Sequence, residues 1–149
     1  MTVIQELFFG SNPQWVGAAT WSASHSLLFV LNSGGSYPGL TAWAVNLGCS
    51  LTKVWTAAIP YVPSIFQFVQ ASVSGDLVWV GSVNANGASI FYAVNAITGA
   101  LAYTSPALDT STFAYTSPVV ANGRVYVSAF QGTESTAPAI NTIFTVFGL

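Results

Sequence analysis

Short runs of β-branched, aromatic and leucine residues recur along the chain, each just after a tight-turn sequence. Aligning one valine from each run, Val30, Val80 and Val127, gives spacings of 50 and 47 residues. A regular spacing of this size indicates a repeat architecture. In the second run both alternating sets of side chains are apolar, which predicts a strand covered on both faces. The runs are Leu27–Leu31, Leu77–Gly81 and Arg124–Ser128.

A second marker follows each run at a similar period. It is a short stretch of aromatic and valine residues. The valines Val45, Val94 and Val146 of these stretches are spaced by 49 and 52 residues. Two markers with a shared period predict three copies of a unit of roughly fifty residues. The stretches are Trp43–Asn46, Tyr92–Asn95 and Phe144–Phe147.

Each copy is interpreted as four short antiparallel strands. The two markers are the second and third strands, and fourth strands are expected near Leu51–Thr56 and at Leu101–Thr104. Four-stranded units at this period are typical of β-propeller blades, so the predicted fold class is all-β. A first strand precedes each tight turn, and the Asn-Gly of the third turn is a strong hairpin signal. The turns are Ser24–Ser26, Ser74–Asp76 and Ala121–Gly123.

The repeats predict a lead-in segment and three blades. Residues 1–16 form the lead-in, followed by blade A at 17–60, blade B at 61–110, and blade C at 111–149, which ends at its third strand. Closed propellers have about four to eight blades. We therefore expect the C-terminal part of a larger propeller; the alternative is a ring assembled from several chains. Thr2–Phe9 is then a closing strand or the last strand of a preceding blade.

Composition suggests where such a chain works. Of the 149 residues 52% are hydrophobic and only 4% are charged, against about 25% charged in an ordinary soluble domain. The surface must therefore be covered by Ser, Thr, Asn, Gln and Gly. A surface of this composition favours an extracellular or cell-surface protein, or a chain within a larger assembly. No Asn-x-Ser/Thr acceptor for N-linked sugar is present.

The same composition excludes some function classes. Two basic residues and a net charge of −2 argue against binding of nucleic acid or of an anionic membrane surface. The most apolar stretch, 54–69, is broken by Pro60 and Pro63, so no transmembrane helix is expected. Residues 1–16 lack the basic start of a secretory signal. The single cysteine, Cys49, is expected to be a small buried residue; the alternative is pairing with another chain or with a missing segment.

Two motifs point to a family. Ser117–Ser128 has a Ser-Pro-Val-Val strand, a glycine turn and a Val-Tyr-Val strand, and Tyr92–Gly99 reads Tyr-Ala-Val-Asn-Ala-Ile-Thr-Gly. Both resemble the pyrroloquinoline-quinone-like repeat of quinoprotein-type β-propellers, with Asn95 where Asp is usual. Trp55 and Tyr103 fall where that family often has Trp. The ending resembles propellers whose last blade takes its fourth strand from the N-terminus. The resemblance implies the architecture, since most such repeats bind no quinone.

No catalytic or cofactor site can be assembled from the sequence. A quinone enzyme would need acidic calcium ligands, whereas the four acids are scattered, and Cys49 has no neighbouring cysteine. His25, the one histidine, is interpreted as a polar turn residue and not as a member of a catalytic triad. We therefore predict a non-enzyme with no catalytic residue, cofactor or metal. The acids are Glu6, Asp76, Asp109 and Glu134.

The predicted function is a non-catalytic scaffold that binds a protein partner or further copies or blades of the same assembly. Three variable loops, Asn32–Gly39, Ser82–Ser89 and Gln131–Asn141, should share one rim, where binding loops usually lie. Trp43 and Trp79 are expected in the core. Alternatives are part of a quinone-dependent dehydrogenase with catalytic residues outside this chain, and a carbohydrate-binding propeller with a glycan ligand. Candidate loop residues are Ser36, Tyr37, Asn84, Asn86, Gln131 and Glu134, and candidate exposed aromatic residues are Trp15 and Trp21.

Overall fold

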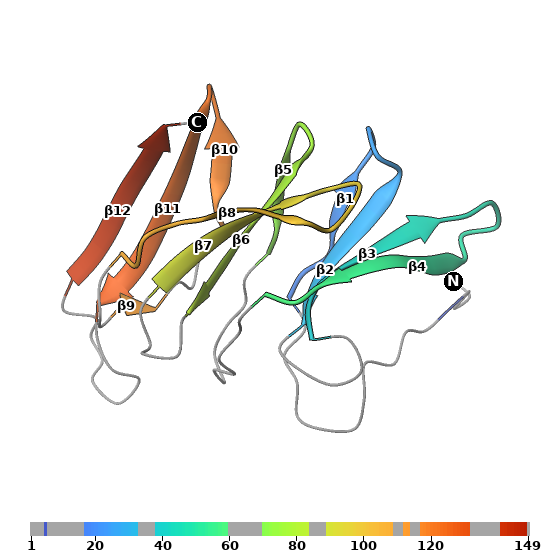
Figure 1. Cartoon of the computed structure of the whole chain (residues 1–149), viewed down its shortest axis with the longest axis horizontal. Coiled ribbons are helices and arrows are strands. Elements are labelled where there is room, and N and C mark those ends of the chain that lie inside the picture. The colour runs from blue at the N-terminus through green and yellow to red at the C-terminus, as the bar shows by residue number, and fades with distance from the viewer. Residues whose placement is uncertain are drawn as a thin grey trace.

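The computed structural model describes residues 5, 17–32, 38–59, 70–83, 89–108, 112–113, 117–131 and 141–148. Within them the protein is all-β and contains no helix, as the repeats predicted. Three antiparallel sheets stand side by side along the chain, and they do not close into a ring (Figure 1). No helix in this part of the chain is long and apolar enough to cross a membrane, which agrees with the prediction.

The sheets follow one another in sequence, and their strands are ordered as they occur in the chain. The first sheet has β1 (Thr20–Ser22), β2 (Leu27–Asn32), β3 (Gly39–Val45) and β4 (Leu51–Ala57). The second has β5 (Ser72–Ser74), β6 (Leu77–Val83), β7 (Ser89–Asn95) and β8 (Leu101–Thr104). The third has β10 (Val119–Ala121), β11 (Arg124–Gln131) and β12 (Asn141–Gly148), and the short β9 (Thr112–Phe113) pairs with the end of β11.

Hydrogen-bond registers identify the equivalent residues of the three sheets. In the first sheet one transverse row of Cα partners runs through Thr20, Phe29, Ala42 and Trp55. The same row in the second sheet is Ser72, Trp79, Ala93 and Tyr103. In the third sheet it is Val119, Tyr126 and Val146. Both complete rows end at a β-bulge, after Ala42 and after Ala93, which supports the equivalence.

These registers correct the sequence alignment of the third strands. The partners of Val30, Val80 and Val127 are Thr41, Tyr92 and Thr145, so the true spacings are 51 and 53 residues instead of 49 and 52. The β3–β4 hairpin continues its pairing two residues beyond the point at which the β7–β8 pairing ends. The valine chosen in the first sheet therefore lies next to the turn and not at the equivalent strand position. A one-residue slip moves side chains to the other face, and this is the error made at Val146.

The core lies between the sheets. One cluster joins the first sheet to the second: Phe29, Leu40 and Ala42 pack against Val78, Val80, Tyr92 and Val94. Another joins the second sheet to the third, where Trp79, Phe91 and Ala93 meet Val125 and Val127. The β6 strand therefore buries alternate side chains on opposite faces, as its continuous apolar run predicted. Trp43 and Trp79 are both buried, as expected.

The first strands of neighbouring sheets are also linked by a repeated hydrogen bond. Thr20 Oγ1 donates to Ala71 O at 2.6 Å, and Ser72 Oγ donates to Pro118 O. Thr20 and Ser72 occupy the same row position, and the third sheet has Val119 there, which is exposed. The third sheet therefore has no hydroxyl at this position that could donate the same hydrogen bond to a further sheet.

Candidate functional site

A tryptophan of the first sheet docks on a glycine turn of the second. Trp55 Nε1 donates to Ala96 O at 3.1 Å, and the Phe29 and Trp55 ring centroids are 5.8 Å apart. Gly99 has φ +74°, and a Cβ placed on it would lie 2.7 Å from Trp55 Cδ2. Only glycine meets both conditions, since a side chain disfavours this φ and would strike the ring. The β7–β8 turn is therefore shaped to receive Trp55.

Asn95 holds this turn in shape. Its Oδ1 accepts hydrogen bonds from the backbone N–H of Ile97 at 3.0 Å, and from the N–H and Oγ1 of Thr98 at 2.9 and 3.1 Å. Gly99 N–H donates to Asn95 O, which closes the turn. An Asx turn needs only a side-chain oxygen at this position. Asn95 supplies this oxygen.

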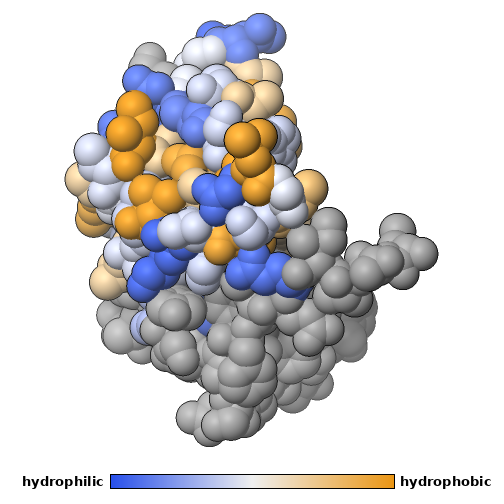
Figure 2. Space-filling model, turned by 90° about the vertical axis from the view of Figure 1, so that its right-hand side faces the viewer, coloured by the Kyte–Doolittle hydropathy of each residue, from blue (hydrophilic) through white to orange (hydrophobic). Residues whose placement is uncertain are grey.

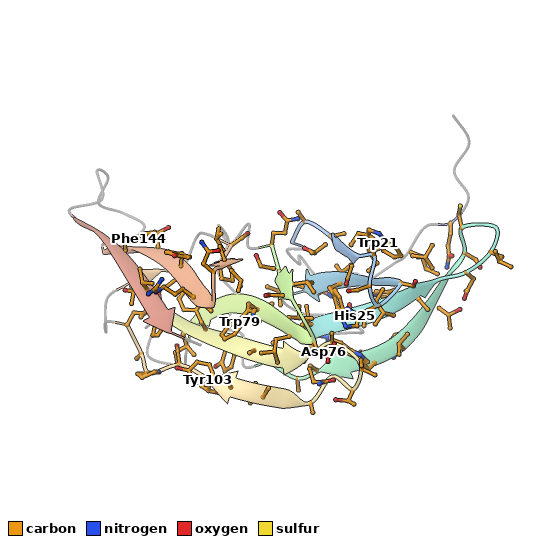
Figure 3. The ribbon with its side chains drawn as sticks, turned by 90° about the horizontal axis from the view of Figure 1, so that it is seen from above. Trp21, His25, Asp76, Trp79, Tyr103 and Phe144 are labelled. Carbon is orange, nitrogen blue, oxygen red and sulfur yellow. The ribbon has the colours of Figure 1, made fainter. Side chains whose placement is uncertain are left out.

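The junction between the second and third sheets has the residues equivalent to Trp55 and Phe29. Within the described residues, however, no glycine turn packs on them. Tyr103 and Trp79 occupy the positions of Trp55 and Phe29, and their ring centroids are 6.1 Å apart. Beside them lies a pocket of about 250 Å³ lined by apolar side chains and open on one side. Figure 3 shows Trp79 within the layer of sheets and Tyr103 at its outer side. The pocket is lined by Leu77, Trp79, Ala102, Tyr103, Phe147 and Gly148.

Trp79 carries an unpaired donor in this wall. Its side chain is 4% exposed, and Nε1 is buried without a hydrogen-bond partner among the described residues. A buried unpaired N–H costs about 1–3 kcal/mol. A second buried tryptophan, Trp43, is satisfied, because its Nε1 donates to Thr41 Oγ1 at 3.0 Å. Of these two buried tryptophans, Trp79 is therefore the one without a hydrogen-bond partner, and it lies at the same junction as the pocket.

The outward face of the third sheet departs from the repeat. Leu40 and Phe91 are equivalent residues and are 0% and 1% exposed, whereas their counterpart Phe144 is 66% exposed. Val146, the counterpart of two fully buried alanines, is also exposed. Tyr126 lies beside Phe144 with ring centroids 6.1 Å apart. These side chains sit where each preceding sheet is covered by the next one, and Figure 3 shows Phe144 at that end of the molecule.

Exposed apolar side chains at the other end of the molecule have a different origin. Val45, Leu47 and Val54 lie on or beside the longer β3–β4 hairpin, and they are exposed. Figure 2 shows the first-sheet side, where apolar patches alternate with polar ones. The outward row of the first sheet is instead largely buried, with Thr41 and Trp43 at 0% and 5% exposure. The outward row of the third sheet, by contrast, is open at Phe144 and Val146.

A cluster of polar side chains joins the β1–β2 turn to the β5–β6 turn. His25 Nε2 lies 3.0 Å from Asp76 Oδ1, and Nδ1 is hydrogen-bonded to Ser22 Oγ at 2.8 Å and to Ser24 Oγ at 3.1 Å. Hydroxyl, imidazole and carboxylate stand in the order found in serine hydrolases. The Asp76 side chain is 71% exposed, so its charge is largely solvated. The cluster therefore acts as a clamp between two turns (Figure 3), and His25 lies in a turn as expected.

The sequence-based candidates fall mostly outside the described residues. This holds for Trp15, Ser36, Tyr37, Asn84, Asn86 and Glu134, and for the side chain of Gln131. Trp21 is described and is 50% exposed on β1. Cys49 is exposed, so the expectation of a buried residue was wrong. The reason is the extended β3–β4 hairpin, which places Cys49 in its turn.

Sequence reasoning missed the open site at the third sheet. The repeat alignment contained a signal for it, because blade C was expected to end at its third strand, but the slip of one residue at Val146 hid which face would be open. Within the described part of the chain, no three His, Cys, Asp or Glu side chains gather as metal ligands.

No protein-family model matches the chain, and no curated protein matches it. The resemblance to quinoprotein repeats therefore stays a prediction.

Proposed function

We propose that the chain is a non-catalytic scaffold of β-propeller-type blades that binds another protein, or further blades of the same assembly, through its third sheet. The observation that carries this proposal is the series Leu40, Phe91 and Phe144, which is buried, buried and exposed. Each of the first two side chains is covered by the following sheet. The third has the same position and an equally apolar side chain, which supports a covering sheet there as well.

The character of the open face supports a protein partner. Phe144, Val146 and Tyr126 provide an aromatic and aliphatic centre on this face. Arg124 lies two residues before Tyr126 on β11, at one end of the same face. Aromatic residues and arginine are enriched in protein interfaces. A partner that covers this face must also leave the Arg124 guanidinium paired or in water, because burial of an unpaired charge is costly. We expect an acidic group opposite it.

The rim loops remain part of the proposal as a second binding surface. The strand ends that flank them, Asn32 with Gly39, Val83 with Ser89 and Gln131 with Asn141, are paired residues in three adjacent sheets. They lie along the lower edge of the array in Figure 1. Loops anchored on one edge of a rigid scaffold are suited to binding. The low surface charge supports an extracellular or cell-surface site of action.

A glycan is the alternative ligand, and one observation favours it. Trp21 is half exposed on the short strand β1, and an exposed indole face can stack on a sugar ring. A glycan array probed with the wild-type chain and with Trp21→Ala tests this alternative. Loss of every hit in the variant would support it, and an array without hits would remove it.

The scaffold function is tested by the native mass of the chain in its source cells. The wild type should sediment in a complex well above 15.6 kDa, and the double variant Phe144→Asp/Val146→Asp should sediment as the free chain. Leu101→Asp is a matched control, because Leu101 is similarly exposed on β8, away from this face. It should stay in the complex. A wild-type chain that sediments alone would contradict the proposal.

A further inference from the structure

The third sheet differs from the other two at one edge. Strands β3 and β7 each lie between two partners, with β4 and β8 on their outer sides. Strand β12 is eight residues long and pairs only with β11 among the described residues. Its other side presents backbone N–H and C=O groups, and such an edge is a template for an added strand.

The pocket at this edge corresponds to a filled space at the preceding junction. The pocket residues Leu77, Trp79 and Tyr103 match Leu27, Phe29 and Trp55 by register, and Phe147 and Gly148 match Val94 and Asn95. At the preceding junction the chain that leaves Asn95 is the turn Ala96–Gly99, which covers Trp55. The structure itself thus shows what fits in this kind of space.

We propose that the β12 edge and the Trp79–Tyr103 pocket bind a β-strand of another polypeptide that begins with a glycine turn. The strand would pair antiparallel with β12, and the turn would lie on the Tyr103 ring as Gly99 lies on Trp55. This inference deepens the proposed function, because it rests on the third sheet being an incomplete blade. The ligand is defined by its chemistry: a tight turn with glycine at positive φ, followed by a short apolar strand.

The unpaired donor fits this ligand. Trp79 lines the pocket, and its buried Nε1 has no hydrogen-bond partner among the described residues. A turn bound in the pocket would bring several backbone carbonyls close to this ring. At the preceding junction Trp55, the counterpart of Tyr103, donates to a turn carbonyl, that of Ala96. A solvated side chain or a lipid would supply neither the strand pairing nor the glycine contact.

Among the described residues, no free segment of this kind is present. Thr98-Gly99 is the one Thr-Gly pair in the sequence, and that turn is already packed against Trp55. Gln5, from the lead-in, is hydrogen-bonded to the backbone of Leu51 at 2.6 Å in the first sheet, at the opposite end of the array from β12 (Figure 1). A separate polypeptide is therefore the occupant proposed.

The test uses the full chain and a synthetic peptide with the sequence of residues 95–104, Asn-Ala-Ile-Thr-Gly-Ala-Leu-Ala-Tyr-Thr, capped at both ends. Calorimetry should show saturable binding of one peptide per chain. Hydrogen exchange should show protection of β12 amides that do not bond to β11. Replacing the peptide glycine by valine should weaken binding about tenfold or more, because a β-branched residue is strongly disfavoured at positive φ.

Variants of the chain locate the site. Trp79→Phe should weaken peptide binding about three- to tenfold through loss of one hydrogen bond. Tyr103→Ala removes a ring that is 41% exposed, and it should also weaken binding. Trp43→Phe is the matched control, since it removes an indole N–H that is already satisfied within the first sheet; it should leave the peptide affinity unchanged.

Binding that does not saturate at about 1 mM peptide, which is weak on the affinity scale, would overturn the proposal. So would equal affinity of the glycine and valine peptides, or unchanged affinity in both pocket variants. Concentration-dependent protection of β12 without peptide would also overturn it, because the occupant would then be a second copy of the chain. The outcome is separable from that of the scaffold test, because Phe144→Asp/Val146→Asp alters the outward face and leaves the pocket side chains in place. Peptide binding in a chain that forms no native complex would refute only the scaffold function.

Discussion

The Trp55 indole of the first sheet rests on Gly99 of the second, and the contact leaves no room for a Cβ at Gly99. One residue from each of two neighbouring repeats thus sets a limit on how closely the two sheets can approach at this point. The hydrogen bond from Trp55 Nε1 to Ala96 O adds direction to the contact. This pair is the best place to test whether the sheets fold as one cooperative unit.

Gly99→Ala should destabilise the chain strongly. The left-handed φ costs an L-residue about 1–2 kcal/mol, and displacement of the Trp55 ring adds about 1–3 kcal/mol, as overpacking does. We expect a loss of about 3 kcal/mol in the free energy of unfolding, measured by urea denaturation. Gly75→Ala is the control, because Gly75 has φ +56° and open space around its Cβ position. It should lose only the conformational part, and equal losses in the two variants would show that the ring contact contributes nothing.

The His25–Asp76 clamp should contribute modestly to stability. Asp76 is well exposed, so the coupling energy from a double-mutant cycle of His25→Ala and Asp76→Ala should be about 0.2–1 kcal/mol. His25→Ala alone should cost more than Asp76→Ala, because Ser22 is buried and loses the 2.8 Å hydrogen bond. Thermal or urea unfolding gives all four free energies.

Ser24→Ala is the matched control for this clamp. Ser24 Oγ also contacts His25 Nδ1, at 3.1 Å, but the residue is exposed and can exchange this contact for water. Its loss should change the free energy of unfolding by less than about 0.5 kcal/mol. A larger effect than that of His25→Ala would mean that Ser24, and not the imidazole, organises the turn.

Tyr92 should make the chain sensitive to alkali. Burial raises the pKa of the Tyr92 hydroxyl above its usual value of 10.0, so the folded chain retains a proton that the unfolded chain releases. Stability is therefore unaffected by this group below about pH 10 and falls as the pH rises above it. Tyr92→Phe should flatten that fall in urea titrations between pH 9 and about 11. Curves of equal slope for the two proteins would contradict this assignment.

Much of the local structure could be predicted because it depends on short-range patterns. The apolar run Leu77–Val80 indicated a strand covered on both faces, and the Asn-Gly of Asn122–Gly123 indicated a hairpin. Both features are present. Trp55 and Tyr103 were also selected from the sequence as equivalent residues, and the registers place both in the same row.

The remaining features depend on register, which composition does not encode. The β3–β4 hairpin pairs two residues further than its counterpart, so the Val-Asn marker followed the turn instead of the core. The same extension exposes Cys49. Neither the His25–Asp76 contact nor the open face at Phe144 could be predicted, because each requires knowing how two sheets are placed relative to one another.

Cys49 should be accessible and conformationally strained in the native chain. It is exposed and has φ +65°, a region that costs a non-glycine residue about 1–2 kcal/mol. Native protein should react with a thiol reagent such as Ellman's reagent at one equivalent per chain without denaturant. Cys49→Gly should raise the free energy of unfolding by up to about 1 kcal/mol, and Cys49→Ala should leave it nearly unchanged, because alanine retains the Cβ. A thiol that reacts only after unfolding, or a destabilised glycine variant, would show that the turn holds Cys49 in another conformation.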